Sequence, residues 1–163
     1  MSANRAPVLN GESGSFRLGV AWIMMWTALA IHVTDEALTG FLFVYNPTVL
    51  ALRAMLGFWP MPTFEFREWL IDLSVGIIIL ATLSPFAFRN AWWIRPIFFF
   101  IAIVAGLLNA AGHTIATVLG HTVDTVRFAR PAPGFYSSPL LIIVSIYSLL
   151  QLRRSKSLET RSR

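Results

Sequence analysis

Long apolar segments alternate with short polar connections along this chain, and four of them are long enough to cross a bilayer. They lie near residues 18–38, 66–87, 92–118 and 135–152. Because about 20 helical residues span the hydrocarbon core, we predict an all-α fold, a polytopic integral membrane four-helix bundle. Between the first two spans, Asn46-Pro47 is typical of a helix cap followed by the first helical residue. We therefore expect a short interfacial helix at 47–58.

Composition agrees with a membrane protein and excludes several other classes. Of the 163 residues, 56% are hydrophobic and only 13% are charged. We expect a polar N-terminus at 1–17, a single membrane domain at 18–152 and a basic tail at 153–163. The net charge of +5 falls at helix flanks and in the tail, so no nucleic-acid partner is expected. Without cysteine, disulfides, thiolate nucleophiles and zinc-thiolate sites are excluded.

The distribution of Lys and Arg predicts that both termini are cytoplasmic. With four spans, the termini and the connection between the second and third spans share one side. That side carries nine basic residues and the other side carries four, which fits the positive-inside rule. One alternative is a signal-peptidase site at Ala28-Leu29-Ala30, where cleavage would detach the first helix. We expect no cleavage there because apolar character resumes at residues 41–44.

Polar residues stand near the outer ends of two apolar segments. His32, Asp35 and Glu36 lie in the first span, and Asn109 and His113 lie in the third. His32 and Glu36 are spaced i, i+4, as are Asn109 and His113, so each pair shares a helix face. At 1.5 Å per residue, the first pair lies about 21 and 27 Å along its helix and the second about 22 and 28 Å. We therefore predict that the two pairs meet in one buried, outward-facing site.

Two imidazoles and a carboxylate form a donor set that zinc uses and that iron or manganese also accepts. We predict that His32, Glu36 and His113 bind a divalent metal, with zinc favoured over iron or manganese. Glu36, Asp35 and Asn109 are the candidate catalytic residues: Asp35 as a further ligand or general base, Asn109 as an orienting group. In the alternative reading, the same side chains form a polar lock between helices and carry out no chemistry.

Two further polar residues are candidates for the same site. Asp72 lies about one turn into the second span, and Tyr136 precedes the fourth. Both fall near the outward-facing third of the bundle, where the other polar groups gather. We therefore consider them additional members of the predicted site.

The order of these features resembles a family of small bacterial membrane proteins named for its His-x-x-Glu-Glu motif. His32-Val33-Thr34-Asp35-Glu36 is similar to that motif, with Asp35 in place of the first glutamate. Residues 109–113 resemble the family's later Asn-x-x-x-His, and residues 136–139 resemble its Tyr-Ser-Pro-Gly stretch, with an inserted serine and no final glycine. The resemblance covers residues 18–152 and implies a multi-pass protein of the bacterial inner membrane with a polar site.

Three functions fit these residues, and the sequence leaves them open. The first is a metal-dependent enzyme, with hydrolysis of a lipophilic substrate as the favoured reaction and non-haem iron oxygenation as a variant. The second is a metal-free isomerase that moves a proton on an unsaturated lipid. The third is a non-enzymatic protein that binds or transports a small molecule or ion. The favoured partner is a lipid or another hydrophobic small molecule.

Overall fold

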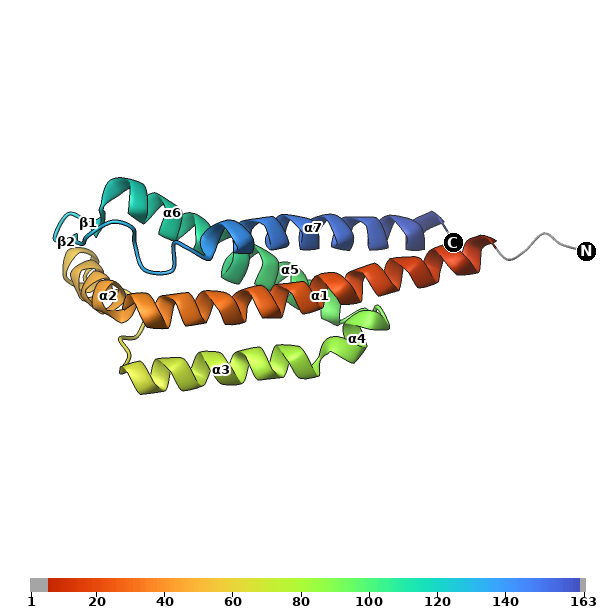
Figure 1. The fold of residues 1–163 in the computed structure, drawn as a ribbon, viewed down its shortest axis with the longest axis horizontal. Helices are drawn as coiled ribbons and strands as arrows, with labels where there is room; N and C mark the ends of the chain where they lie inside the picture. The colour runs from red at the N-terminus through yellow and green to blue at the C-terminus, as the bar shows by residue number, and fades with distance from the viewer. Residues whose placement is uncertain (1–5, 162–163) are drawn as a thin grey trace, which may run out of the picture.

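The computed structural model describes the backbone of residues 6–161 and the side chains of residues 14–155. These residues form helices and one two-stranded antiparallel pair, which confirms the all-α class (Figure 1). The elements are, in chain order, α1 (Ala6–Thr39), α2 (Leu42–Leu56), α3 (Phe66–Thr82), α4 (Ser84–Phe88), α5 (Ile94–Phe100), the π-helix η1 (Ile101–Leu108), α6 (Asn109–Leu119), β1 (His121–Val123), β2 (Val126–Arg127) and α7 (Ser138–Arg161).

The longer helices run along one axis of the molecule. α1, α3, the continuous α5–η1–α6 segment and α7 follow this axis, whereas α2 and the strand pair lie together at one end (Figure 1). We call this the distal end, because α1 begins and α7 ends at the opposite end (Figure 1). The distal end therefore gathers the ends of α1 and α6 and the beginning of α7.

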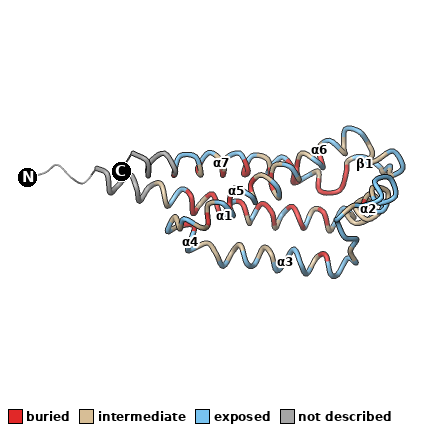
Figure 2. The backbone as a smooth tube through the Cα atoms, turned by 180° about the vertical axis from the view of Figure 1, so that it is seen from behind, coloured by how far each residue is buried: buried red, intermediate tan, exposed pale blue. Residues whose placement is uncertain are grey.

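The core lies where α1, α7 and the α5–η1–α6 segment pack together, and Figure 2 shows buried backbone along these helices. Leu18, Trp22 and Met25 are buried on one face of α1 at the spacing that the helical repeat requires. Phe98 of α5 meets Trp22 edge-on, with ring centroids 5.1 Å apart. A Cβ added to Gly106 of η1 would collide with the Ser145 hydroxyl of α7. η1 therefore packs closely against α7, directly before α6 begins.

α3 is almost uncovered by the rest of the protein. Only 6% of its apolar window, within Phe66–Phe88, is buried, and Trp69 is the buried residue of α3. Ile71, Val75, Ile78 and Ile79 are each about half exposed or more. Soluble monomers rarely present a contiguous apolar surface of this extent, so α3 has the surface of a lipid-facing helix.

Three helical segments are long and apolar enough to cross a membrane: Gly14–Thr39, Phe66–Phe88 and Ile94–Leu119. They coincide with the first three predicted spans and support a membrane protein. Of the fourth predicted span, 135–152, residues 138–152 lie in α7, which packs along α1 but is not among these three segments. Its apolar residues are followed directly by Arg153 and Arg154, and the helix continues to Arg161. The predicted tail from residue 153 is thus helical to that point.

The helix predicted at 47–58 begins at Leu42, and Pro47 lies inside it. The prediction that Asn46 caps this helix is therefore wrong. The side-chain amide of Asn46 donates to the carbonyl of Phe64 over 2.9 Å, and Asn46 Oδ1 accepts from the Phe64 N–H over 3.0 Å. Pro47 removes only one hydrogen bond, to the carbonyl four residues earlier, and that residue, Phe43, is exposed. Asn46 instead fastens α2 to the connection that precedes α3.

Candidate metal centre

Three metal-binding side chains from two helices meet at the distal end. His32 and Glu36 come from α1 and His113 comes from α6, and their exposed fractions are 1%, 4% and 7%. Glu36 Oε1 lies 3.0 Å from His113 Nε2 and 3.5 Å from His32 Nε2. The two imidazole rings are edge to face, with centroids 4.9 Å apart. We call these three residues the triad; the prediction that the first and third apolar segments bring them together is confirmed.

The triad has the dimensions of a metal site. One donor atom from each residue can be chosen so that all lie within 4.8 Å of one another. Zinc–nitrogen and zinc–oxygen bonds of about 2.0–2.2 Å in a tetrahedron separate neighbouring donors by about 3.3 Å. The separations of 3.0 and 3.5 Å from Glu36 lie on either side of this value. The triad could therefore hold a metal ion.

The second ring nitrogen of His32 is engaged by Ser137, in the loop before α7. His32 Nδ1 lies 2.8 Å from Ser137 Oγ, and Ser137 Oγ lies 2.8 Å from Asp35 Oδ2. The Ser137 hydroxyl donates to Asp35 Oδ2 and lies 3.2 Å from a second acceptor, the Gly134 carbonyl. Its oxygen therefore accepts from His32 Nδ1–H. Nε2 of His32 is thus the ring nitrogen that faces Glu36 and Asn109, over 3.5 and 3.0 Å. Outer hydrogen bonds of this kind fix the orientation of metal-binding histidines.

Asp35 is therefore linked to the triad through Ser137. Its carboxylate also accepts the backbone N–H of Ser137 over 2.8 Å, next to the first residue of α7. Asp35 and Glu36 are about 100° apart around α1, so one meets the start of α7 while the other meets α6. The sequence suggested Asp35 as a further ligand or a general base beside the metal. In the structure its carboxylate contacts Ser137.

Asn109 lies beside His32, at the first residue of α6. Its Nδ2 is 3.0 Å from His32 Nε2, within hydrogen-bond distance. α6 follows the π-helix η1 directly, and π-helical turns often occur at functional sites, where they shift the helix register. No residue in the apolar run 101–108 predicts this π-helix.

A loop covers the triad, and Gly134 makes it possible. Gly134 has φ +78°, a conformation that residues with a Cβ rarely adopt. A Cβ at this position would lie 2.9 Å from His113 Cε1 and 3.0 Å from Glu36 Cγ. The Gly134 N–H donates to Thr39 Oγ1 over 3.1 Å, and its carbonyl accepts from the Ser138 hydroxyl over 2.8 Å. We call residues 132–137 the covering loop.

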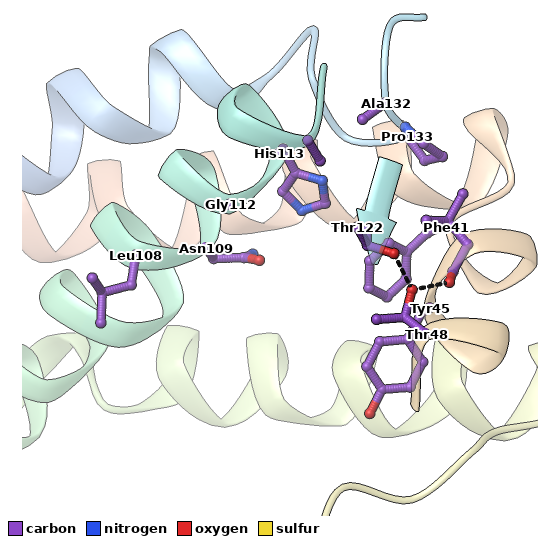
Figure 3. Close-up of a pocket in the computed structure, with 12 residues that line it drawn as sticks. Phe41, Tyr45, Thr48, Leu108, Asn109, Gly112, His113, Thr122, Ala132 and Pro133 are labelled. Atoms are coloured by element: carbon purple, nitrogen blue, oxygen red, sulfur yellow. Dashed lines mark hydrogen bonds between the residues drawn. The ribbon is translucent and has the colours of Figure 1, made fainter. Parts of the chain in front are cut away.

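Two cavities reach the triad. The His113 cavity has a volume of about 250 Å³, and His113 and Asn109 form one wall while Phe41, Tyr45 and Thr48 form another (Figure 3). The Glu36 cavity has a volume of about 340 Å³ and lies among α1, α2 and the start of α3. Phe41 lines both cavities. Its ring centroid is 5.7 Å from that of His113 and 5.8 Å from that of Trp69. The Phe41 ring therefore contacts both of these rings.

The structure does not bring the two additional candidates to the triad. Asp72 is exposed on α3, the helix with the least covered surface, and Tyr136 is 68% exposed, with its ring beside Phe135. Sequence reasoning also missed Phe41, Gly134 and the contact of Ser137 with His32. The serine had one available signal, since a hydroxyl directly before a long helix is a common N-terminal feature.

No protein-family model, curated protein or solved structure matches this chain.

Proposed function

We propose that this protein is a metal-dependent membrane enzyme that hydrolyses a lipophilic substrate at the triad of His32, Glu36 and His113. The observation that carries the proposal is the convergence of three buried metal-binding side chains at dimensions that suit a shared ion. Ionisable residues at membrane depth cost at least about 2.5–3.5 kcal/mol each on insertion scales and usually mark functional sites. Zinc is favoured over iron or manganese because two histidines and a glutamate are a donor set of catalytic zinc.

The proposal includes four spans, with α7 as the fourth, and a cytoplasmic location for both termini. α7 packs along α1 and ends where α1 begins (Figure 1). Arg153 and Arg154 are exposed near that end of α7, and α4, which precedes Arg89, lies at the same end (Figure 1). This clustering agrees with a positive-inside orientation. Motif order leads us to assign the chain to the His-x-x-Glu-Glu family, and hence to a bacterial inner membrane.

The triad residues and their neighbours have distinct roles in this hydrolysis. A bound divalent metal would polarise the substrate carbonyl and lower the pKa of a coordinated water towards neutrality. Water adds to the carbonyl carbon, the bond to the leaving oxygen or nitrogen breaks, and a carboxylic acid and an alcohol or amine result. The second carboxylate oxygen of Glu36 accepts the proton of the water and returns it to the leaving group. Asn109 orients the carbonyl, and we assign Asp35 to positioning His32 through Ser137.

Elemental analysis of the detergent-purified protein tests this proposal. We expect stoichiometric metal in the natural protein and its loss in His113→Ala, with free carboxylic acid released from lipid esters only by the metal-loaded form. His121→Ala is the matched control, because His121 lies on β1, outside the triad. Natural protein that takes up no added zinc, iron or manganese, or His113→Ala that retains metal, would refute the proposal.

A second candidate function needs no metal. The direct contact of 3.0 Å between Glu36 Oε1 and His113 Nε2 allows a proton to pass between the two side chains. As an isomerase, Glu36 would remove a proton beside a double bond of an unsaturated lipid, and the proton would return to a different carbon as the double bond shifts. Activity that persists after treatment with a chelator favours this function over hydrolysis. If neither the metal-loaded nor the chelator-treated protein is active, a protein that binds or transports a small molecule or ion without catalysis is favoured.

A further inference from the structure

The two cavities approach the triad from different sides. Glu36 lines one cavity, and His113 and Asn109 line the other. Glu36 and His113 are in direct contact, with 3.0 Å between Oε1 and Nε2. The polar atoms of the triad therefore lie at the junction of two spaces rather than at the bottom of one pocket.

The cavity walls indicate what each space accepts. The Glu36 cavity is walled mainly by aromatic and aliphatic side chains, among them Leu42, Phe64 and Trp69. Besides Glu36, its polar members are Asn46, which holds the backbone of Phe64, and Glu65, which is exposed. The His113 cavity is also largely apolar, with Val44, Leu108 and Ala116 in its walls, and its hydroxyl pair, Thr48 and Thr122, is joined by a mutual hydrogen bond (Figure 3). The walls of both cavities therefore favour a hydrocarbon ligand.

The position of the cavities indicates where such hydrocarbon comes from. The Glu36 cavity lies where the candidate span Gly14–Thr39 ends and the span Phe66–Phe88 begins. The His113 cavity lies beside the outer half of Ile94–Leu119, where Leu108 is 60% exposed. Both cavities are therefore at depths that adjoin lipid, so a molecule can enter from the membrane.

We propose that the substrate is a lipid ester or amide with apolar arms on both sides of the reacting bond, one in the Glu36 cavity and one in the His113 cavity. This inference rests on the proposed hydrolysis and specifies its substrate class. The reacting carbonyl then lies beside the triad, at the polar junction between the two apolar spaces. A lipid whose reacting bond is at the end of its chain would fill one cavity and leave the other vacant.

Photo-crosslinking with an uncleavable probe tests this inference. The probe is a long-chain dialkyl ketone with a diazirine in each arm, supplied in vesicles of phosphatidylglycerol and phosphatidylethanolamine. It keeps the carbonyl but has no bond that hydrolysis can break. We expect labelled residues in both cavities, and we expect that filling either cavity lowers the labelling of both, because one molecule bridges them.

Ala37→Phe fills the Glu36 cavity, and Ala116→Phe fills the His113 cavity. Each should reduce labelling of both cavities about tenfold, equivalent to about 1.4 kcal/mol of lost affinity. Ile78→Phe is the matched control, because Ile78 is 61% exposed on the outer surface of α3. Leu42→Trp repeats the test if Ala37→Phe does not fold, and Leu108→Trp repeats it if Ala116→Phe does not fold.

The outcomes separate this inference from the proposed function. If filling one cavity leaves labelling of the other unchanged, or if labels appear only on the outer surface of α3, the two-armed substrate is wrong even when the triad binds metal. If natural protein takes up no metal but the labelling of the two cavities remains coupled, the proposed hydrolysis is wrong and the two-armed ligand stands.

Discussion

Replacing Ser137 by alanine isolates the outer support of the triad. The hydroxyl lies 2.8 Å from both His32 Nδ1 and Asp35 Oδ2, whereas the backbone N–H of Ser137 keeps its own bond to Asp35 in the variant. The change leaves a buried imidazole N–H without an acceptor, which costs about 1–3 kcal/mol. Loss of such an outer partner typically lowers metal affinity about 10–100-fold. We expect zinc affinity to fall within this range while the triad itself is intact.

Competition with a chromophoric zinc chelator measures this affinity in detergent-purified protein. Ser138→Ala is the matched control, because Ser138 is also buried but its hydroxyl donates to the Gly134 carbonyl and does not contact His32. It should lose about 1 kcal/mol of stability with zinc affinity unchanged. An unchanged affinity in Ser137→Ala, or an equal loss in the two variants, would refute a positioning role for Ser137.

Three further predictions follow from particular positions. Gly134→Ala should lower the thermal unfolding midpoint more than Gly57→Ala does: both have positive φ, a strain of about 1–2 kcal/mol for alanine, but only at Gly134 does the new Cβ meet other atoms within 4 Å. Asp72→Asn should leave metal content unchanged in elemental analysis, because Asp72 is exposed on α3; a loss of metal would place it at the site. In this cysteine-free chain, a membrane-impermeant maleimide should label Thr63→Cys but not Ser157→Cys from outside intact cells; labelling of both would contradict a membrane-spanning α7.

Depth counting along the chain was sufficient to predict the triad. Glu36 and His113 lie about 27 and 28 Å along two helices that run in the same direction, and the structure places Glu36 Oε1 3.0 Å from His113 Nε2. Helical rise is nearly constant, so this inference needs no knowledge of side-chain packing. The direction in which each side chain points is harder to predict: Asp35, one residue from Glu36, contacts Ser137.

Features that depend on tertiary contacts were beyond the sequence. Asn46 and Pro47 carry a local helix-start signal, but the side chain of Asn46 holds the Phe64 backbone instead. Ser137 lies in a loop with no periodic pattern, so nothing local relates it to His32, 105 residues away. Phe41 lies in the turn between α1 and α2 and lines both cavities, a position that depends on how these two helices pack.

The uncovered surface of α3 has a consequence for how this chain tolerates sequence change. On α1, Leu18, Trp22 and Met25 fit into a densely packed interior, where a single methylene can matter. On the outer surface of α3, Ile71 and Ile78 have only fluid acyl chains as neighbours in a bilayer, and these adapt to any shape. Substitution there is restricted by polarity alone, so α3 can drift among apolar residues while α1 stays nearly fixed.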